Sequence, residues 1–576
     1  MARPRTTIPG FRLALAAAAL AVWAQAWAAP APPPDVVFLD GKIATLDAKG
    51  SSASAVAVKD GRFVAVGSTK AIRKLAGKKT RVVSLGGKTV VPGLIDAHCH
   101  PFPTMVFTSS VDARAPGVPS VAKALENLSA RVRTTPKASW IFVVGASSSQ
   151  TKFVEKRLPT RAELDRAAPD NPVWFWNGTH GEVLNSAGLA ALGVTRSNPR
   201  LPRGGRVLLD GNGEPTGEMF EAEANAPVAD PPPVMEGWVR KDIPALWNAH
   251  GVTTVVGMFE LPEVAVLRKV AASGFRPDVR YVAFAFAEPD GAGMPENLDE
   301  IRMPAGAAPD FYRTAGIKLW IDGEVDARSG LCAQPYADPA GVPGDGKGLQ
   351  VTTQAEADAF ADRGSNAGLA VGMHSTCDGA YPIAVSAFQK AAARGRPGTI
   401  QRMEHYGQFM ALTDAERKTI SDLDVRVITQ PSWLLFLGTS TYHLLGEARA
   451  STGFRYGTMV KQGLRPAASS DTTGVYLQAV NPFLAMKTAV TRMSDFGVVQ
   501  PEEAISVEDA LRMWTIWGAR SVGLDADRGS IEPGKLADMT VLSDDVFTMP
   551  PATIDQVRVE RTIVGGEVVF TRATGR

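Results

Sequence analysis

The chain has 576 residues, of which 45% are hydrophobic and 21% are charged, an ordinary globular composition with enough apolar material for a large core. Its formal net charge is +2, and three arginines near the N-terminus account for that excess, so the rest of the chain is close to neutral. Since no basic patch or charge run stands out, the composition argues against nucleic acid and anionic membranes as partners.

Residues 1–28 are predicted to be a signal peptide. Basic residues precede an apolar run over residues 13–24, and Ala26-Trp27-Ala28 offers a cleavage site before Ala29. The run is shorter than the roughly 20 residues that a membrane span needs. An uncleaved anchor is the alternative. We expect cleavage, no stable membrane insertion afterwards, and a periplasmic or secreted protein.

Both ends of the mature chain are predicted to form β-strands. Residues 35–90 contain short alternating apolar stretches between turns, and residues 529–576 do the same, with Gly565-Gly566 as a hairpin turn. Neither piece can bury a core alone, so we expect one composite β-sandwich built from both. Ahead of the second piece, Ser506 is expected to cap a long helix that runs to about Val522.

Two histidines end an apolar stretch that follows a Pro-Gly break. Because side chains alternate along a strand, His98 and His100 point to the same face. Two imidazoles on one face at the end of a strand can both coordinate one metal ion, such as Zn²⁺, which readily binds nitrogen ligands. An isolated His-x-His is also typical of two half-buried histidines, so the pair needs support from the rest of the chain.

Four further polar residues lie in or just after short apolar stretches. His374, His405 and Asp471 each follow such a stretch. Lys318 lies within one, and alternation places it with Asp322 on the face opposite to the apolar residues. These positions favour a metal site, and an ion pair of Lys318 with Asp322 or a nearby acid is the alternative.

The spacing of these residues predicts a (β/α)₈ barrel over residues 91–528. Such a barrel uses roughly 31 residues for each βα unit. His405 follows His374 by 31 residues, and Asp471 follows His405 by 66, about two units. If the histidine pair ends strand one, Lys318 falls on strand four and the others on strands five, six and eight. All would then meet at the mouth of the barrel, where active sites of this fold lie.

The interval between His100 and Lys318 is too long for three units and predicts an insertion. It spans 218 residues, where three units need roughly 93. We expect the surplus to form a lid-like region at about 103–245, over the mouth. It would contribute Trp174, Trp176 and His180 to the pocket, with core packing as the alternative for the two tryptophans.

The three cysteines, Cys99, Cys332 and Cys377, are too few and too scattered for a disulfide framework. Cys99 alternates away from the two histidines beside it, which predicts a small core residue. Cys377 lies three residues past His374 and is expected to line the site.

Longer phrases accompany these residues in order along the chain, among them VVPGLIDAHCH, PTRAELDRAAPDNPVWF, NGTHGEVLNSAGL, GIKLWIDGEV, VGMHSTCDGA, RMEHY, SSDTTG and GSIEPGKLADMTVL. Together they resemble the amidohydrolase superfamily, and within it the YtcJ-like (amidohydrolase 3) group, which contains N-substituted formamide deformylases. The resemblance implies a distorted (β/α)₈ TIM barrel with a composite β-sandwich and an insertion over the mouth.

The resemblance also implies a zinc site with one or two ions per chain. Its ligands would be, in chain order, His98, His100, Lys318, His374, His405 and Asp471. One ion would be held by the histidine pair and Asp471, and the second by the other two histidines. Lys318, carboxylated on its Nζ, would bridge them, because a neutral amine is a poor bridge between two dications.

Roles for individual residues follow from the same resemblance. Asp471 would take a proton from the attacking water and deliver it to the leaving amine. His180 matches a position that faces substrate and would stabilise the oxyanion, although Asn177 stands where the family has Asp. Asp378 would orient a histidine from outside the ligand set.

We therefore expect an exported zinc-dependent amidohydrolase that cuts a C–N bond in an amide, N-acyl or N-formyl small molecule through a metal-bound hydroxide. An ester or lactone hydrolase using the same site is one alternative, and a catalytically silent binding or regulatory protein on this scaffold is another. A serine hydrolase is disfavoured because no Gly-x-Ser-x-Gly elbow follows a strand. The sequence does not determine the oligomeric state.

Overall fold

The computed structural model describes residues 32–145, 152–178, 180–201, 205–222, 225–227, 232–286, 293–394 and 398–573. The predicted signal peptide, residues 1–28, lies outside these ranges. Among the helices that are described, none has both the length and the apolar character that crossing a membrane requires.

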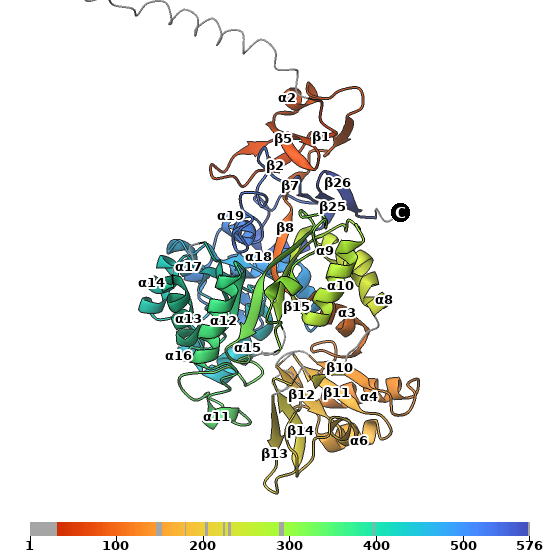
Figure 1. Ribbon diagram of the computed structural model, residues 1–576, viewed down its shortest axis with the longest axis vertical. Helices are drawn as coiled ribbons and strands as arrows, with labels where there is room; N and C mark the ends of the chain where they lie inside the picture. The colour runs from red at the N-terminus through yellow and green to blue at the C-terminus, as the bar shows by residue number, and fades with distance from the viewer. Residues whose placement is uncertain are drawn as a thin grey trace, which may run out of the picture.

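Eight parallel strands form the central sheet, which is nearly closed into a barrel (Figure 1). Their chain order is also their spatial order: β8 (Leu94–Cys99), β15 (Val252–Glu260), β16 (Arg280–Phe286), β17 (Tyr312–Trp320), β18 (Ala370–His374), β19 (Gln401–Glu404), β20 (Arg426–Thr429) and β21 (Ala467–Ala468). Because both faces of β15 and β16 are buried, their sequences are almost continuously apolar. The structure thus confirms the predicted parallel barrel in its main lines.

The first and last strands meet beside the predicted ligands. The backbone N–H of Asp471, just past β21, donates to the carbonyl of His98 on β8 at 2.9 Å. The buried carboxylate of Asp96 strengthens this junction, because it accepts bonds from the backbone N–H and the hydroxyl of Ser470 and from Trp247 Nε1. These contacts fix the position of Asp471 relative to the first strand.

Helices surround the sheet, on its outer side and at its mouth (Figure 1). They are α3 (Pro101–Ser109), α8 (Pro232–Gly237), α9 (Ile243–Asn248), α10 (Leu261–Ala272), α12 (Gln354–Asn366), α13 (Tyr381–Ala393), α14 (Asp414–Asp422), α15 (Trp433–Leu445), α16 (Glu447–Ala450), α17 (Tyr456–Lys461) and α18 (Pro482–Thr491). Complete capping boxes begin α12 and α14, where Thr353 and Thr413 pair with a glutamate three residues later.

The long helix expected from Ser506 to about Val522 is wrong. Ser506 does cap a helix, but the segment forms two short ones, α19 (Val507–Met513) and α20 (Ile516–Arg520). The break at Trp514 frees its carbonyl to accept a hydrogen bond from the backbone N–H of Ile95 at 2.6 Å. This bond ties the segment to the first barrel strand, and tertiary contact overrides local helix propensity here.

The two chain ends build two small sheets at one end of the barrel (Figure 1). The larger sheet has the order β26-β25-β24-β7-β2-β3, with β26 (Glu567–Thr571), β25 (Val559–Val564), β24 (Met539–Leu542), β7 (Thr89–Pro92), β2 (Lys42–Ala44) and β3 (Ser52–Ala53). The other sheet has the order β5-β4-β1-β6, with β5 (Arg62–Gly67), β4 (Ala55–Lys59), β1 (Val36–Leu39) and β6 (Arg81–Ser84). Phe38, Val56, Met539 and Ile563 share one apolar core, so residues from both ends of the chain pack together.

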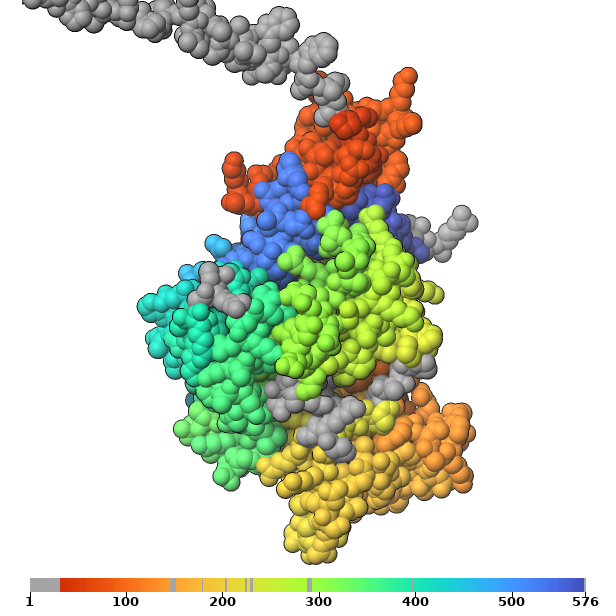
Figure 2. All heavy atoms as spheres, viewed as in Figure 1, coloured from red at the N-terminus to blue at the C-terminus, as the bar shows by residue number. Residues whose placement is uncertain are grey.

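The inserted residues form a separate lobe at the opposite end of the barrel (Figure 2). Its sheet has the order β13-β14-β12-β11-β10-β9, with β13 (Arg206–Leu209), β14 (Pro215–Phe220), β12 (Gly181–Leu184), β11 (Val173–Asn177), β10 (Ile141–Gly145) and β9 (Val111–Ala113). Helices α4 (Val121–Val132), α6 (Arg161–Ala167) and α7 (Ser186–Ala191) accompany it. The lobe has its own apolar core and faces the carboxyl ends of the barrel strands.

Candidate functional site

A cavity of about 670 Å³ lies between the barrel mouth and the inserted lobe. Five of the predicted ligands line it, namely His100, Lys318, His374, His405 and Asp471. His98 does not line the cavity because it is fully buried, but its ring contacts Asp471 and Lys318, which do. The residues that the spacing assigned to five different strands therefore meet at one place.

His98, His100 and Asp471 form a compact group. Their potential ligand atoms all lie within 4.8 Å of one another. Asp471 Oδ1 is 3.4 Å from His98 Nε2 and 3.3 Å from His100 Nε2. Asp471 has a left-handed backbone conformation, with φ of 45°, which turns the chain back toward β8 after the last strand. Two imidazoles and a carboxylate at this spacing suit a divalent zinc-type metal.

The ring of His98 is oriented by an ion pair that the sequence analysis did not identify. Its Nδ1 lies 2.8 Å from Glu404 Oε2, and Arg402 in turn binds both oxygens of Glu404 at 2.7 and 3.0 Å. Because a carboxylate only accepts, Nδ1 carries the proton and Nε2 keeps its lone pair. That lone pair faces Lys318 Nζ at 3.1 Å. A carboxylate–histidine pair of this kind is typical of metal sites.

His374 and His405 lie opposite each other, with ring centroids 4.5 Å apart. His374 Nε2 donates to the carbonyl of Gly323 at 3.0 Å, and His405 Nδ1 donates to Gln430 Oε1 at 3.1 Å. The second nitrogen of each ring is left as an acceptor. In the described part of the chain, the buried Nε2 of His405 has no hydrogen-bond partner. A metal ion would satisfy this atom, so the residues present fit such an ion.

Burial controls the charges of these groups. It lowers the pKa of His98, His374 and His405 well below the ordinary histidine value, which keeps the rings in the neutral form that binds metals. Burial also lowers the pKa of Lys318 to about 8. For Asp471, burial acts to raise the pKa, but the interactions with His98, His100 and Lys318 outweigh it and hold the pKa below its usual value.

The alternative ion pair between Lys318 and Asp322 is not formed. Lys318 Nζ lies over the ring of Trp320, 4.7 Å from its centroid. Asp322 is buried and accepts bonds from the backbone N–H groups of Leu331, Thr376 and Cys377. It joins the loops that follow β17 and β18 and so supports the Gly323 carbonyl that holds His374.

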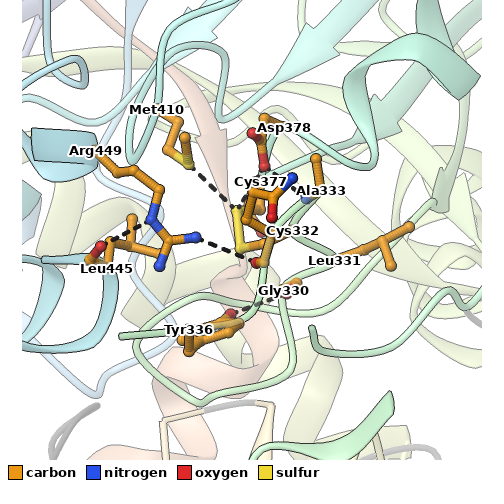
Figure 3. Close-up of a disulfide and its surroundings, with 12 residues drawn as sticks. Gly330, Leu331, Cys332, Ala333, Tyr336, Cys377, Asp378, Met410, Leu445 and Arg449 are labelled. Atoms are coloured by element: carbon orange, nitrogen blue, oxygen red, sulfur yellow. Dashed lines mark hydrogen bonds between the residues drawn. A yellow bond between two sulfur atoms is a disulfide. The ribbon is translucent and has the colours of Figure 1, made fainter. Parts of the chain in front are cut away.

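The prediction that Cys377 lines the cavity is wrong. Cys377 forms a disulfide with Cys332 instead (Figure 3). The two cysteines are 45 residues apart and lie in the loops after neighbouring strands, a proximity that sequence spacing does not reveal. A closed loop of this length stabilises the fold by roughly 4 kcal/mol in the chain-entropy account. Cys99 is a buried free cysteine, as predicted.

Asp378 and Trp174 also lie elsewhere than predicted. Asp378 does not contact a histidine in the described hydrogen-bond network, because its carboxylate accepts from the backbone N–H of Ala333 (Figure 3). Of the two tryptophans, Trp176 lines the cavity, whereas Trp174 is fully buried in the core of the inserted lobe. The two side chains share one face of β11, with ring centroids 5.8 Å apart, and only Trp176, nearer to the end of the strand, reaches the cavity.

His180 reaches the cavity from the inserted lobe, between β11 and β12. Its ring centroid lies 5.2 Å from that of His374. Nδ1 is 2.8 Å from Glu221 Oε2, and Nε2 is 3.4 Å from Glu324 Oε2. Both glutamates were missed by the sequence analysis. Glu324 offered a signal, since it lies two residues after Asp322 in the loop that leaves strand four.

Known proteins resemble this chain over most of its length. The model of the amidohydrolase family matches residues 81–570. N-substituted formamide deformylase of Arthrobacter pascens is 28% identical over 559 residues, which cover 93% of this chain and 98% of that protein. Putative amidohydrolase YtcJ of Bacillus subtilis is 26% identical over 554 residues, 93% of this chain and 99% of that protein. In fold, the chain resembles an uncharacterized metal-dependent hydrolase from Pyrococcus horikoshii, with a TM-score of 0.67 and 23% identity over 90% of this chain and 99% of that one.

Glu404→Gln should weaken zinc binding by about 10- to 100-fold, because the amide holds the His98 ring less firmly and reduces its basicity. Competition with a chromophoric chelator measures the affinity, and a urea melt checks that the variant folds. Glu126→Gln, which removes an exposed carboxylate paired with Lys123, is the matched control. Unchanged zinc affinity in Glu404→Gln would show that this contact does not orient a ligand.

Proposed function

Because the chain belongs to the amidohydrolase family and is a hydrolase of carbon–nitrogen bonds other than peptide bonds, we propose that it is an exported, zinc-dependent enzyme that cleaves an amide, N-acyl or N-formyl bond in a small molecule. One observation carries the proposal. His98, His374 and His405 each commit one ring nitrogen to an acceptor, which leaves the second as a potential metal ligand, and the rings of His98 and His374 lie 4.9 and 4.5 Å from that of His405.

The centre divides naturally into two metal positions. His98, His100 and Asp471 would hold one zinc ion, and His374 with His405 would hold the second. Lys318 Nζ lies 3.1 Å from His98 Nε2 and lines the same cavity as His374 and His405, and a carboxyl group on this nitrogen would add anionic oxygens to the metal centre. When bound, zinc would polarise the substrate carbonyl and lower the pKa of water to about 7.

The residues of the chain supply the proton transfers. Asp471 lines the cavity beside His98 and His100. Its carboxylate would take the proton of the attacking water and then deliver it to the nitrogen of the leaving amine, first as a base and then as an acid. His180 lines the same cavity with its ring 5.2 Å from that of His374, and its Nε2 would stabilise the oxygen of the substrate as negative charge develops there.

The choice of an amide rests on the relatives. The formamide deformylase of Arthrobacter pascens acts, by its name, on N-substituted formamides, and it aligns with this chain over nearly its full length. We therefore propose small N-acyl or N-formyl amines as substrates. An ester or lactone would be attacked at the same kind of carbonyl carbon.

Two features support the proposal of export. Residues 1–28 have the pattern of a signal peptide. Cys332 and Cys377 form a disulfide, and such bonds persist in oxidising compartments such as the periplasm or the cell exterior.

Protein reconstituted with zinc should hold about two ions per chain after dialysis, as measured by elemental analysis. Lys318→Ala should reduce the content to about one, since the bridge is lost. The control is Lys137→Ala, at an exposed lysine on the inserted lobe. Less than about half an equivalent in the unaltered protein would reject the dinuclear site.

Asp471→Asn should reduce kcat by about 10²–10⁴-fold, because the amide cannot carry the proton. Release of free amine from N-formyl and N-acyl amines measures turnover, and elemental analysis should find that most of the zinc is retained.

His180→Ala should lower kcat/KM by about 10²–10³-fold without loss of zinc, as expected for an oxyanion donor. If the enzyme turns over only esters and lactones, the proposed amide substrate is wrong. Full activity of Asp471→Asn would contradict the role of Asp471 in proton transfer.

Protein isolated from outside the cytoplasm of the producing cell should begin at Ala29. Its intact mass should show Cys332 and Cys377 protected from alkylation until a reductant is added. Full-length protein in the cytoplasm with both thiols free would contradict export.

A further inference from the structure

Glu324 is a buried carboxylate at the cavity that the proposed mechanism does not use. It lines the cavity, and only 6% of the residue is exposed. Oε2 lies 3.4 Å from His180 Nε2, while Oε1 has no hydrogen-bond partner among the described residues. A buried carboxylate oxygen without a partner is costly, and in native proteins it calls for an explanation.

The charge distribution along the cavity wall gives a second, independent observation. Glu260, at the end of β15, and Glu263, in the first turn of α10, also line the cavity. Among the described lining residues, Lys318 is the only lysine or arginine, and it belongs to the proposed metal centre. Outside that centre the described wall therefore carries three carboxyl groups and no lysine or arginine. Burial raises the pKa of Glu263 and Glu324 well above the usual value, and a cation beside them would favour their charged forms. Such a wall attracts cations and repels anions.

The rest of the wall is rich in aromatic side chains. Trp176, Trp238, Trp320, Trp433, Phe107 and Tyr476 all line the cavity. Aromatic faces bind apolar groups and also attract an ammonium ion through their electron-rich faces. Aromatic walls combined with carboxylates are the surroundings that bind organic ammonium ions most strongly.

We propose that the substrate is a cationic amide: an N-acyl or N-formyl compound with an apolar or aromatic body and an ammonium group that binds at Glu324. The proposal rests on the proposed function and adds the substrate class. Its geometry follows from His180, which contacts Glu324 through Nε2 and has its ring 5.2 Å from that of His374. The ammonium site is thus one imidazole away from a proposed metal ligand, and one substrate molecule can reach both.

Two substrates of the same shape test the proposal. N-formyl-4-(aminomethyl)benzylamine carries an ammonium group, and N-formyl-4-methylbenzylamine is its neutral counterpart. The zinc-loaded enzyme should prefer the cationic compound by at least about tenfold in kcat/KM, the range of one hydrogen bond to a charged group. Glu324→Gln should reduce this preference about tenfold, measured as the ratio of kcat/KM for the cationic compound to kcat/KM for the neutral one.

A binding measurement separates this proposal from the reaction itself. Quenching of tryptophan fluorescence should report tighter binding of benzylammonium than of benzyl alcohol, and Glu324→Gln should remove most of that difference. Glu126→Gln, on the surface of α4, removes the same charge away from the cavity and should leave the difference in affinity between the two compounds unchanged. Equal or weaker binding and turnover of the cationic compounds would overturn the proposal while leaving the hydrolase function intact.

The remaining outcomes are also informative. If neither compound is hydrolysed but benzylammonium still binds through Glu324, the cation site stands and the proposed amide reaction fails. If Glu324→Gln does not fold, the preference of the unaltered enzyme between the two matched compounds decides the question.

Discussion

The junction between the first and last barrel strands is the contact on which the site depends. The backbone bond from Asp471 to His98 and the bonds that Asp96 makes to Ser470 place an acid from the end of the barrel beside a histidine pair from its beginning. Parallel strands bring their carboxyl ends to one rim, so strands that are far apart in the sequence can contribute ligands to one centre. Opening this junction would separate Asp471 from the histidines even if every other strand stayed in place.

Orientation of the rings matters as much as their proximity. A histidine can present either nitrogen, and a free imidazole would sample both. Glu404, the Gly323 carbonyl and Gln430 each occupy one nitrogen and so define the other as the ligand atom. Burial keeps these rings neutral and removes competing water. The inserted lobe completes the enclosure with His180 and Trp176, and it separates the centre from solvent on the side where substrate must bind.

The sequence predicted the features that follow from regular geometry. Alternation along a strand placed His98 and His100 on one face, and the repeat length of a βα unit placed His374 and His405 on successive strands. It could not reveal contacts between loops, which have no period: the pairing of Cys332 with Cys377, the bond of Asp378 to Ala333 and the acid at Glu324 all arise there. The break between α19 and α20 was missed because its cause is a tertiary bond to Ile95, and local propensity carries no record of such bonds.

The central claim is that six side chains from distant parts of the chain hold metal ions at one centre. Anomalous X-ray scattering at the zinc edge, from crystals of the zinc-loaded protein, tests it most directly. The account predicts one peak among His98, His100 and Asp471, a second between His374 and His405, and added density on Lys318 Nζ that joins the two. The absence of any peak in the cavity, or zinc bound only at other residues, would contradict the account.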